Sequence, residues 1–389
     1  MSEVKRIYLD NASTTPIDGV VLQAMMPYLT ENYGNPSSLH REGMVAKNAI
    51  KKSRLQIAEI ICAKPNEIIF TSGGTESDNL AIFGLAYANS EKGKHIITSV
   101  IEHKAILDAC KKLELNGFDV TYLDVNEDGR ISIDELKNSL RPDTILVSIM
   151  YANNEIGTIQ PIKLISETIK NSVSDAIFHT DACQAANYCD IDVNNLGVDA
   201  MTLSSSKIYG PKGIGCLYLK SGIKINPILV GGGQENGVRS GTENVASIVG
   251  FAKALSIANE LKPKEADRLL DLRNYFIDTV IEKISDVHVN GGLIDRLPNN
   301  INFSIRGVEG ESLILYMDNL GIACSTGSAC SSADLNPSHV LLAIGVPLDM
   351  AHSSVRFSIG RFTSREDIDY TVDKLIECVD RIRKMTAIK

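Results

Sequence analysis

Lys207 is the residue whose surroundings most plainly suggest chemistry. It follows three serines, residues 204–206, at the end of a predicted strand, and it precedes a loop rich in glycine and proline, residues 209–213. A lysine held at a strand end can form a Schiff base with a carbonyl group, and hydroxyls beside it can hold a phosphate. A surface lysine in a turn would have the same local sequence, so this segment alone leaves both interpretations open.

Two more strand ends carry candidate residues. Asp181 ends an apolar run, where a buried carboxylate costs free energy unless it is paired, and a protonated ring nitrogen would be a suitable partner. Gly73, Gly74 and Thr75 lie between another apolar run and a predicted helix start, where glycines can form an anion site. Each has an ordinary alternative, because Asp181 could cap the next helix and a Gly-Gly-Thr turn is weak evidence by itself.

Cys330 lies in a fourth candidate segment, residues 324–334, which consists of small and polar residues. That composition is typical of a mobile loop that carries a functional residue, and a cysteine on such a loop can ionise and act as a nucleophile. A small-residue packing turn is the alternative. No CxxC pair occurs, so Cys183 and Cys324 are interpreted as bystanders and no metal site is predicted.

The elements that would position these residues alternate between strands and helices. Such alternation predicts an α/β fold with a mostly parallel sheet, in which ligands bind at the carboxyl ends of the strands. The predicted strands cover residues 68–71, 95–100, 120–123, 144–150, 177–180 and 200–204, with amphipathic helices over residues 105–115 and 161–171.

The length of 389 residues suits one large and one smaller domain. A charged stretch, residues 260–265, begins a helical pattern over residues 266–284, which places a boundary near residue 259. The predicted domains are a large one over residues 16–259 and a smaller α+β one over residues 1–15 and 260–389, which would hold strands near residues 299–304 and 354–358 and the cysteine loop at about 324–336.

Composition and charge exclude several classes of partner. The net charge of −9 and the pI of about 5.4 describe an acidic surface that repels phosphate backbones, so nucleic acid is not expected to bind. The charged N-terminus leads into no long apolar run, and no stretch of about 18 apolar residues follows. We therefore expect no membrane association, and the cysteine usage indicates a reducing, cytoplasmic location.

Residues 124–129 together with Glu135 match the calcium loop of an EF-hand in ligand types and spacing. The context is wrong, because an EF-hand needs a helix on both sides and residues 118–123 alternate as a strand does. A strand, a polar turn and a helix that starts near Ser132 explain the same residues, so calcium binding is not the favoured interpretation.

Together the four candidate segments resemble the cysteine desulfurases of the NifS/IscS type, which belong to the fold-type I, class V aminotransferase-like enzymes that use pyridoxal 5′-phosphate (PLP). The resemblance runs from Ile7 nearly to the end of the chain. Chance does not explain agreement over so many motifs in the same order. Further matching stretches are residues 7–12, 33–38, 102–105, 153–157, 239–242 and 354–358.

The resemblance implies a role for each matching residue. Lys207 would form the Schiff base with PLP, Asp181 would face the pyridine nitrogen, and Gln184 would face the ring hydroxyl. His103 would stack on the ring and assist proton transfers. Arg356 would pair with the substrate carboxylate in a bidentate fork, with Asn154 near both the cofactor and the substrate. The cofactor phosphate would be held by Gly74, Thr75, Ser204, Ser206 and, from the other subunit of a homodimer, Thr242.

Cys330 matches the sulfur-accepting cysteine of this family. The implied reaction converts L-cysteine to L-alanine and leaves the sulfur as a persulfide on Cys330. The length of the segment after Cys330 resembles the long-loop branch, whose members hand sulfur to proteins such as an iron–sulfur scaffold. Selenocysteine lyase and cysteine sulfinate desulfinase share the same lysine, aspartate and arginine and remain alternatives. A third is a non-catalytic calcium-binding or scaffold protein, against which the presence of Lys207 and Asp181 argues.

Two features depart from the family's pattern. Relatives commonly have histidine before the Schiff-base lysine, where this chain has Ser206. A hydroxyl can still donate to a phosphate, but we expect weaker PLP retention than in a Ser206→His variant. The chain ends at Lys389, without the tail that relatives serving general iron–sulfur assembly use to dock a scaffold, which points to the NifS-like subgroup.

Overall fold

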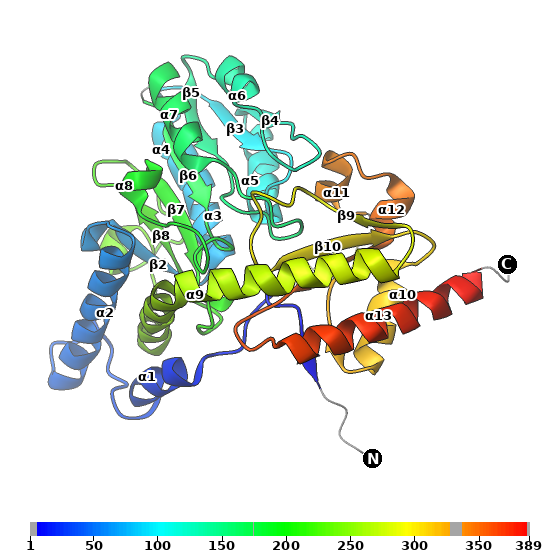
Figure 1. Cartoon of the computed structure of the whole chain (residues 1–389). Helices are drawn as coiled ribbons and strands as arrows, with labels where there is room; N and C mark the ends of the chain where they lie inside the picture. Colours follow the sequence, from blue (N-terminus) through cyan, green and yellow to red (C-terminus); the bar gives the residue numbers. More distant parts are fainter. Residues whose placement is uncertain (1–5, 174, 327–336, 387–389) are drawn as a thin grey trace.

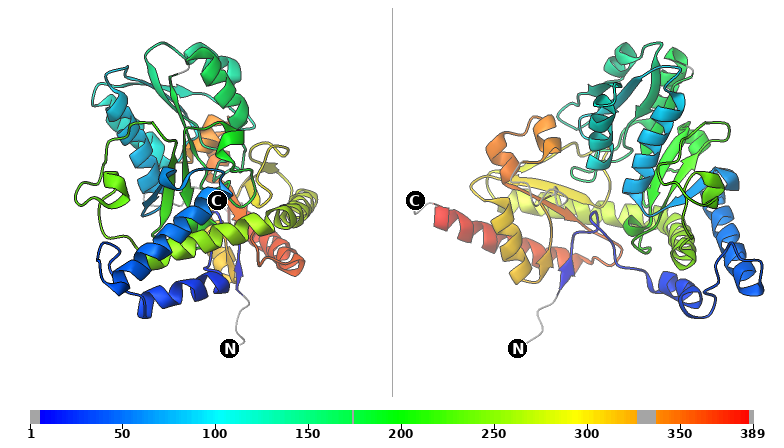
Figure 2. Two further views of the ribbon diagram at one scale, coloured as in Figure 1. Left: turned by 90° about the vertical axis from the view of Figure 1, so that its left-hand side faces the viewer. Right: turned by 180° about the vertical axis from the view of Figure 1, so that it is seen from behind.

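The computed structural model describes residues 6–173, 175–326 and 337–386 (Figure 1). A seven-stranded sheet covered by helices lies beside a smaller sheet, and helix α9 (Val245–Lys283) runs past both. Figure 2 shows the same two parts from the side and from behind. No helix in the described ranges combines the length and the apolar character that a membrane crossing requires.

The large sheet has the strand order β2-β8-β7-β6-β5-β3-β4. Strands β7, β6, β5, β3 and β4 pair in parallel, and only β8 runs antiparallel to its neighbours β7 and β2. The predicted α/β fold with a mostly parallel sheet is therefore confirmed, and each predicted strand of this sheet agrees with the observed one within two residues at either end. The strands are β2 (Ile68–Thr71), β3 (His95–Ser99), β4 (Asp119–Leu123), β5 (Thr144–Ser148), β6 (Ile177–Asp181), β7 (Ala200–Ser204) and β8 (Gly215–Leu219).

Successive strand residues point to opposite faces of the sheet and enter two different cores. Leu146 belongs to the core under the π-helical turn, α4 and α5, whereas Val147 belongs to the core under α2, α7 and α9. Apolar residues on both faces account for the continuous apolar runs in the sequence. The helices of this part are α1 (Gly19–Thr30), α2 (Arg41–Ile60), α3 (Gly74–Asn79), α4 (Leu85–Asn89), α5 (Lys104–Glu114), α6 (Ile133–Ser139), α7 (Ile162–Ser172) and α8 (Val193–Leu196), with a π-helical turn (Leu80–Gly84) between α3 and α4.

The smaller part is built on an antiparallel sheet of order β12-β10-β9 and on a parallel pair, β1 with β11. Phe276 from α9 packs against Phe357 of β12 with ring centroids 5.1 Å apart, and Phe303 of β10 closes the aromatic cluster. The elements are β1 (Ile7–Tyr8), β9 (Val287–Val289), β10 (Asn300–Ile305), β11 (Ile322–Ala323), β12 (Ser354–Ser358), α10 (Gly310–Asn319), α11 (His339–Ala343), α12 (Leu348–His352) and α13 (Arg365–Thr386).

Helix α9 differs from its prediction. The sequence pattern predicts a helix that begins at residue 266, whereas α9 begins at Val245 and continues through Pro263. Pro263 is exposed, so water can satisfy the carbonyl that its missing N–H leaves without a partner. Phe251 of the first half packs in the core of the large sheet, and Phe276 of the second half packs in the smaller core. The boundary at residue 259 stays a prediction, and it would fall inside this helix.

The segment that matches a calcium loop has the predicted context. Strand β4 enters it, residues 125 and 131 pair across a turn, and α6 begins after Ser132, whose hydroxyl accepts a hydrogen bond from the Glu135 N–H. The interpretation as a strand, a polar turn and a helix is therefore confirmed.

Candidate active site

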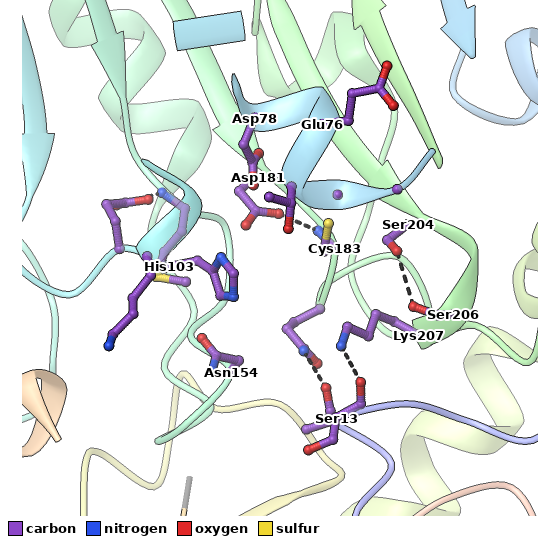
Figure 3. A pocket seen from close by; sticks show the side chains of 18 of the residues that line it. Ser13, Glu76, Asp78, His103, Asn154, Asp181, Cys183, Ser204, Ser206 and Lys207 are labelled. Atoms are coloured by element: carbon purple, nitrogen blue, oxygen red, sulfur yellow. Dashed lines mark hydrogen bonds between the residues drawn. The ribbon is translucent and has the colours of Figure 1, made fainter. Parts of the chain in front are cut away.

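A cavity of about 430 Å³ lies at the carboxyl ends of β6 and β7, the edge of an open α/β sheet where ligands bind (Figure 3). The N-terminal segment and β12 of the smaller part supply the facing wall through Ser13 and Arg356. The predicted site residues that line this cavity are Gly74, Thr75, His103, Asn154, Asp181, Gln184, Ser204, Ser206, Lys207 and Arg356.

Lys207 enters the cavity from a single 3-10 turn that follows β7 directly. Its Nζ donates a hydrogen bond of 2.5 Å to the carbonyl oxygen of Ser13 (Figure 3). Asn187 holds the same turn in place, since its Nδ2 donates a hydrogen bond to the Lys207 carbonyl at 2.7 Å. The hydroxyls of Ser204 and Ser206 lie 3.3 Å apart. The turn therefore presents one amine and two hydroxyls to the same cavity.

Asp181 is the last residue of β6 and is only 7 % exposed. Its Oδ1 accepts a hydrogen bond of 2.9 Å from the Cys183 N–H, so the turn after the strand orients the carboxylate. His179, two residues earlier, is fully buried between the hydroxyls of Ser148 at 2.9 Å and Thr202 at 3.0 Å. Burial lowers the pKa of His179 to about 4, so this histidine is neutral and packed.

Two further buried carboxyl groups line the cavity and were missed by the sequence analysis. Glu102 Oε1 accepts hydrogen bonds from Ser99 Oγ at 2.6 Å and from the Met150 N–H at 2.9 Å, while Oε2 has no hydrogen-bond partner in the described part of the chain. Burial raises the pKa of Glu102 to about 8. Burial and the neighbouring Asp181 raise the pKa of Asp78 as well. Glu102 therefore favours its neutral form near pH 7, and the pKa of Asp78 is shifted in the same direction.

The start of α3 forms a corner suited to an anion. Gly73 has a φ of +151°, which L side chains rarely adopt, and a Cβ on Gly74 would lie 2.7 Å from Cys183 Sγ, so a side chain at either position would disturb this corner. The first N–H groups of a helix point outward without partners in the helix. Behind this corner, Arg239 forms a bidentate pair with Glu76 at 2.8 and 3.3 Å. Backbone N–H groups and the nearby hydroxyls thus converge on one end of the cavity.

His103 caps α5 and faces the cavity. Its Nδ1 accepts a hydrogen bond of 3.1 Å from the Ala105 N–H, so the neutral ring carries its proton on Nε2. His339, the first residue of α11, donates from Nε2 to the Glu102 carbonyl at 3.1 Å and also lines the cavity. The sequence analysis did not assign His339 a role.

Arg356 lies in the middle of β12 and is only 2 % exposed. Its Nη2 donates to Asp10 Oδ1 at 2.9 Å and to Ser13 Oγ at 2.8 Å. Its Nη1 donates to the Asn154 carbonyl at 2.9 Å. Its backbone pairs with Ser325, whose carbonyl accepts the Arg356 N–H at 2.6 Å. Segments far apart in the sequence therefore fix one guanidinium group.

Two predicted site residues do not line the cavity in the described structure. Thr242 is exposed in the segment before α9, and its reach into another subunit stays a prediction. Cys330 lies outside the described residues, and its role also stays a prediction. Cys183, interpreted as a bystander, does line the cavity, and burial raises the pKa of its thiol. Cys324 is buried in the smaller core.

The residues that sequence reasoning missed have no local pattern that marks them. They come from helix turns, from strand ends and from the N-terminal turn, and only the fold brings them to one place. The cavity-lining residues without a predicted role include Ala12, Ser13, Asp78, Glu102, Glu155, Cys183 and His339.

The fold belongs to a known class. The family model described as Aminotransferase class-V matches residues 7–371. A solved structure described as a NifS-like protein superposes with a TM-score of 0.92 at 36% identity, over 97% of this chain and 100% of that one. A second, described as SspA in complex with cysteine, has a TM-score of 0.80 at 39% identity, over 92% and 99%.

A more specific assignment comes from sequence relatives. The protein named cysteine desulfurase IscS of Dictyoglomus turgidum is 52% identical to this chain over 385 residues, which cover 99% of this chain and 97% of that protein. The chain therefore belongs to the cysteine desulfurases of the NifS/IscS type within the aminotransferase class-V family, as the resemblance implied.

Proposed function

We propose that this protein is a PLP-dependent cysteine desulfurase that converts L-cysteine to L-alanine and holds the sulfur as a persulfide on Cys330. The observation that carries this proposal is the placement of Lys207 and Asp181 at the ends of the neighbouring strands β7 and β6, in one cavity. A similar structure described as a complex with cysteine supports the substrate.

The residues in the cavity fit PLP. The cofactor is an aromatic pyridine ring with an aldehyde, a ring hydroxyl and a phosphate. Lys207 supplies an amine, and Asp181 supplies a buried carboxylate for a ring N–H. The glycine corner at the start of α3 would receive the phosphate, because Gly73, Gly74 and Thr75 line that end of the cavity and the first N–H groups of a helix favour an anion. The bound cofactor would supply an electron sink for the charge that develops on the substrate α-carbon.

The residues of this chain would then bind the substrate and move its protons. Arg356 would receive the carboxylate of L-cysteine, and Asn154 would close the same end of the site. Lys207 would take the α-proton with its Nζ, and His103 would carry a proton on Nε2 toward the atom that loses sulfur. Gln184, which lines the cavity beside Lys207, would face the ring hydroxyl.

Cys330 would act as the nucleophile. Its thiolate would attack the substrate sulfur, so that a sulfur–sulfur bond forms, the Cβ–S bond breaks and its electron pair remains on Cβ. Protonation at Cβ and return of the α-proton from Lys207 to Cα would then complete L-alanine. The persulfide would pass to a protein acceptor such as an iron–sulfur scaffold. We further propose a cytoplasmic homodimer in which Thr242 of one subunit reaches the phosphate in the other.

Alanine and protein-bound persulfide formed from L-cysteine test the proposal, with the wild type beside a Cys330→Ala variant. We expect alanine and persulfide from the wild type and no persulfide from the variant. A yellow, PLP-loaded protein that forms no alanine from L-cysteine would contradict the substrate assignment, and selenocysteine and cysteine sulfinate would then be compared in the same assay.

A further inference from the structure

The N-terminal turn, residues 10–13, contacts two cationic side chains that line the cavity, Lys207 and Arg356. Asp10 Oδ1 accepts a hydrogen bond from Arg356 Nη2 at 2.9 Å, and the Ser13 hydroxyl accepts a second one from the same nitrogen at 2.8 Å. The Ser13 hydroxyl also donates to Asp10 Oδ1 at 2.8 Å. The Ser13 carbonyl accepts from Lys207 Nζ (Figure 3). One turn of the chain thus connects the arginine of the smaller part to the lysine of the larger part.

The turn is itself held from both sides. The Asn11 side chain donates to the Ser358 carbonyl at 2.8 Å, and the Ser358 hydroxyl accepts the Ala12 N–H at 2.9 Å. From the other side, Gln184 Nε2 donates to the Ala12 carbonyl at 2.9 Å. Such a turn cannot shift without breaking contacts to β12 and to the cavity wall, so it is a rigid support for the groups bound to it.

Asp10 compensates the buried charge of Arg356. A guanidinium that is 2 % exposed has lost its water and needs a fixed counter-charge and hydrogen-bond acceptors. The ion pair with Asp10 supplies the charge. The Ser13 hydroxyl and the Asn154 carbonyl supply further acceptors, so the plane of the guanidinium is fixed before a substrate arrives. A bidentate fork depends on that plane as well as on the charge.

We propose that Asp10 and Ser13 are positioning residues for the substrate carboxylate, which hold the Arg356 fork in the orientation that receives it. This inference rests on the proposed function, because it takes an α-amino acid as the ligand. Asp10 acts through Arg356 and does not itself line the cavity, whereas Ser13 lines it. Substitution of Asp10 or Ser13 is therefore expected to weaken binding of the ligand carboxylate and to leave binding of the ligand amine unchanged.

Two amines that do not react, L-alanine and ethylamine, distinguish binding of the ligand carboxylate from binding of the ligand amine. L-Alanine and ethylamine have the same amine and methyl groups, but only L-alanine has a carboxylate. Their dissociation constants are measured on the PLP-loaded protein from the change in its absorption, for wild type, Asp10→Ala, Asp10→Asn and Ser13→Ala. We expect Asp10→Ala to weaken L-alanine binding about 10- to 100-fold and to leave ethylamine binding unchanged, as the loss of a hydrogen bond to a charged group predicts.

The other two variants should weaken L-alanine binding less than Asp10→Ala does. Asp10→Asn keeps an acceptor oxygen in place and loses only the charge, so it should recover part of the affinity for L-alanine. Ser13→Ala removes one acceptor and should weaken L-alanine binding about threefold to tenfold. In turnover, KM for L-cysteine should rise in parallel in all three, with kcat within about threefold of the wild type.

Asp318→Ala is the matched control, because Asp318 also pairs with an arginine, Arg6, at 2.8 Å, but on the surface. We expect it to change neither affinity. The inference is overturned if L-alanine binding is unchanged in Asp10→Ala, if both amines weaken equally, or if Asp10→Asn binds L-alanine more tightly because charge repulsion dominates. If Asp10→Ala does not fold, Asp10→Asn and Ser13→Ala carry the same test. Failure of the proposed function is a separate result, since binding of L-alanine needs no turnover.

Discussion

The two walls of the cavity are assembled in different ways. On the wall proposed to hold the cofactor, called here the cofactor wall, Asp181 ends β6, Lys207 follows the neighbouring parallel strand β7, and the two residues lie 26 positions apart. On the wall proposed to bind the substrate carboxylate, called here the substrate wall, Asp10 and Arg356 are separated by 346 positions and meet only because the N-terminal turn packs against β12. The first wall follows from a local rule, since parallel strands end at the same edge of a sheet. The second depends on how the smaller part docks on the larger.

The walls also differ in electrostatics. The cofactor wall contains buried carboxyl groups, Asp78 and Glu102, whose raised pKa values favour the neutral form. The substrate wall keeps a buried charge on Arg356 and compensates it with Asp10. Substitutions that preserve shape and change charge should therefore have different effects on the two walls.

The largest expected effect lies on the cofactor wall, at Lys207. Lys207→Ala removes the amine that would hold the cofactor and take the α-proton, so alanine formation should fall about 10⁴-fold or more. Single-turnover alanine formation with PLP added measures this loss. Lys220→Ala, on the surface beside Asp199, is the control and should match the wild type. Activity within tenfold of the wild type in Lys207→Ala would remove Lys207 from the mechanism.

Asp181 and Asp78 provide a comparison within the cofactor wall. Asp181→Asn removes the charge that would face the ring nitrogen and should weaken PLP binding about 10²-fold or more, as for a buried charge pair that loses one partner. Asp78→Asn should change it less than about threefold, because the raised pKa of Asp78 already favours the uncharged form. The dissociation constants for PLP of the Asp181→Asn and Asp78→Asn variants, compared with that of the wild type, measure this difference. Equal losses in both variants would show that the two carboxyls act as a unit.

Arg356→Lys tests the substrate wall. Lysine keeps the charge but cannot form a bidentate fork or replace all the bonds to Asp10, Ser13 and Asn154. We expect kcat/KM for L-cysteine to fall about 10- to 100-fold, mostly through KM. Arg6→Lys is the surface control. An unchanged KM in Arg356→Lys would show that the carboxylate binds elsewhere.

The smallest effect is expected at Glu102 and depends on pH. The folded pKa of about 8 lies above the ordinary value of about 4.3 for the unfolded chain, so the folded state binds more protons between them and stability falls as the pH rises through this window. Glutamine does not titrate, so the stability of Glu102→Gln should not fall in this pH window through residue 102. We expect it to raise the free energy of unfolding by roughly 1–4 kcal/mol at pH 8, with little change at pH 4.5.

Urea unfolding at the two pH values measures that difference. The exposed Glu59→Gln is the control and should leave the pH dependence unaltered. A Glu102→Gln variant that is less stable than the wild type at pH 8 would contradict the neutral form of Glu102 and would make the two walls more alike in electrostatics.

Local patterns predicted most of the larger part. Strand β7 was predicted with its observed bounds, and β6 was one residue short, because apolar runs that end in polar residues mark buried parallel strands. The start of α9 was wrong by 21 residues, since the charged stretch around Pro263 has the local signature of a boundary and its solvent-facing position is decided by packing. Asp78 and Glu102 were missed because burial, which shifts their pKa values, is not a property of the local sequence.

The sequence by itself determined the strand-end residues of this protein, the α/β class, and the family whose motifs the chain shares. Those features depend on neighbours along the chain and on the common direction of parallel strands. Only the tertiary structure decided that Asp10 and Ser13 hold Arg356, and that Ser13 also meets Lys207. Such contacts arise where distant segments are buried together. A buried guanidinium such as that of Arg356 has lost its water and is stable only beside a counter-charge and hydrogen-bond acceptors.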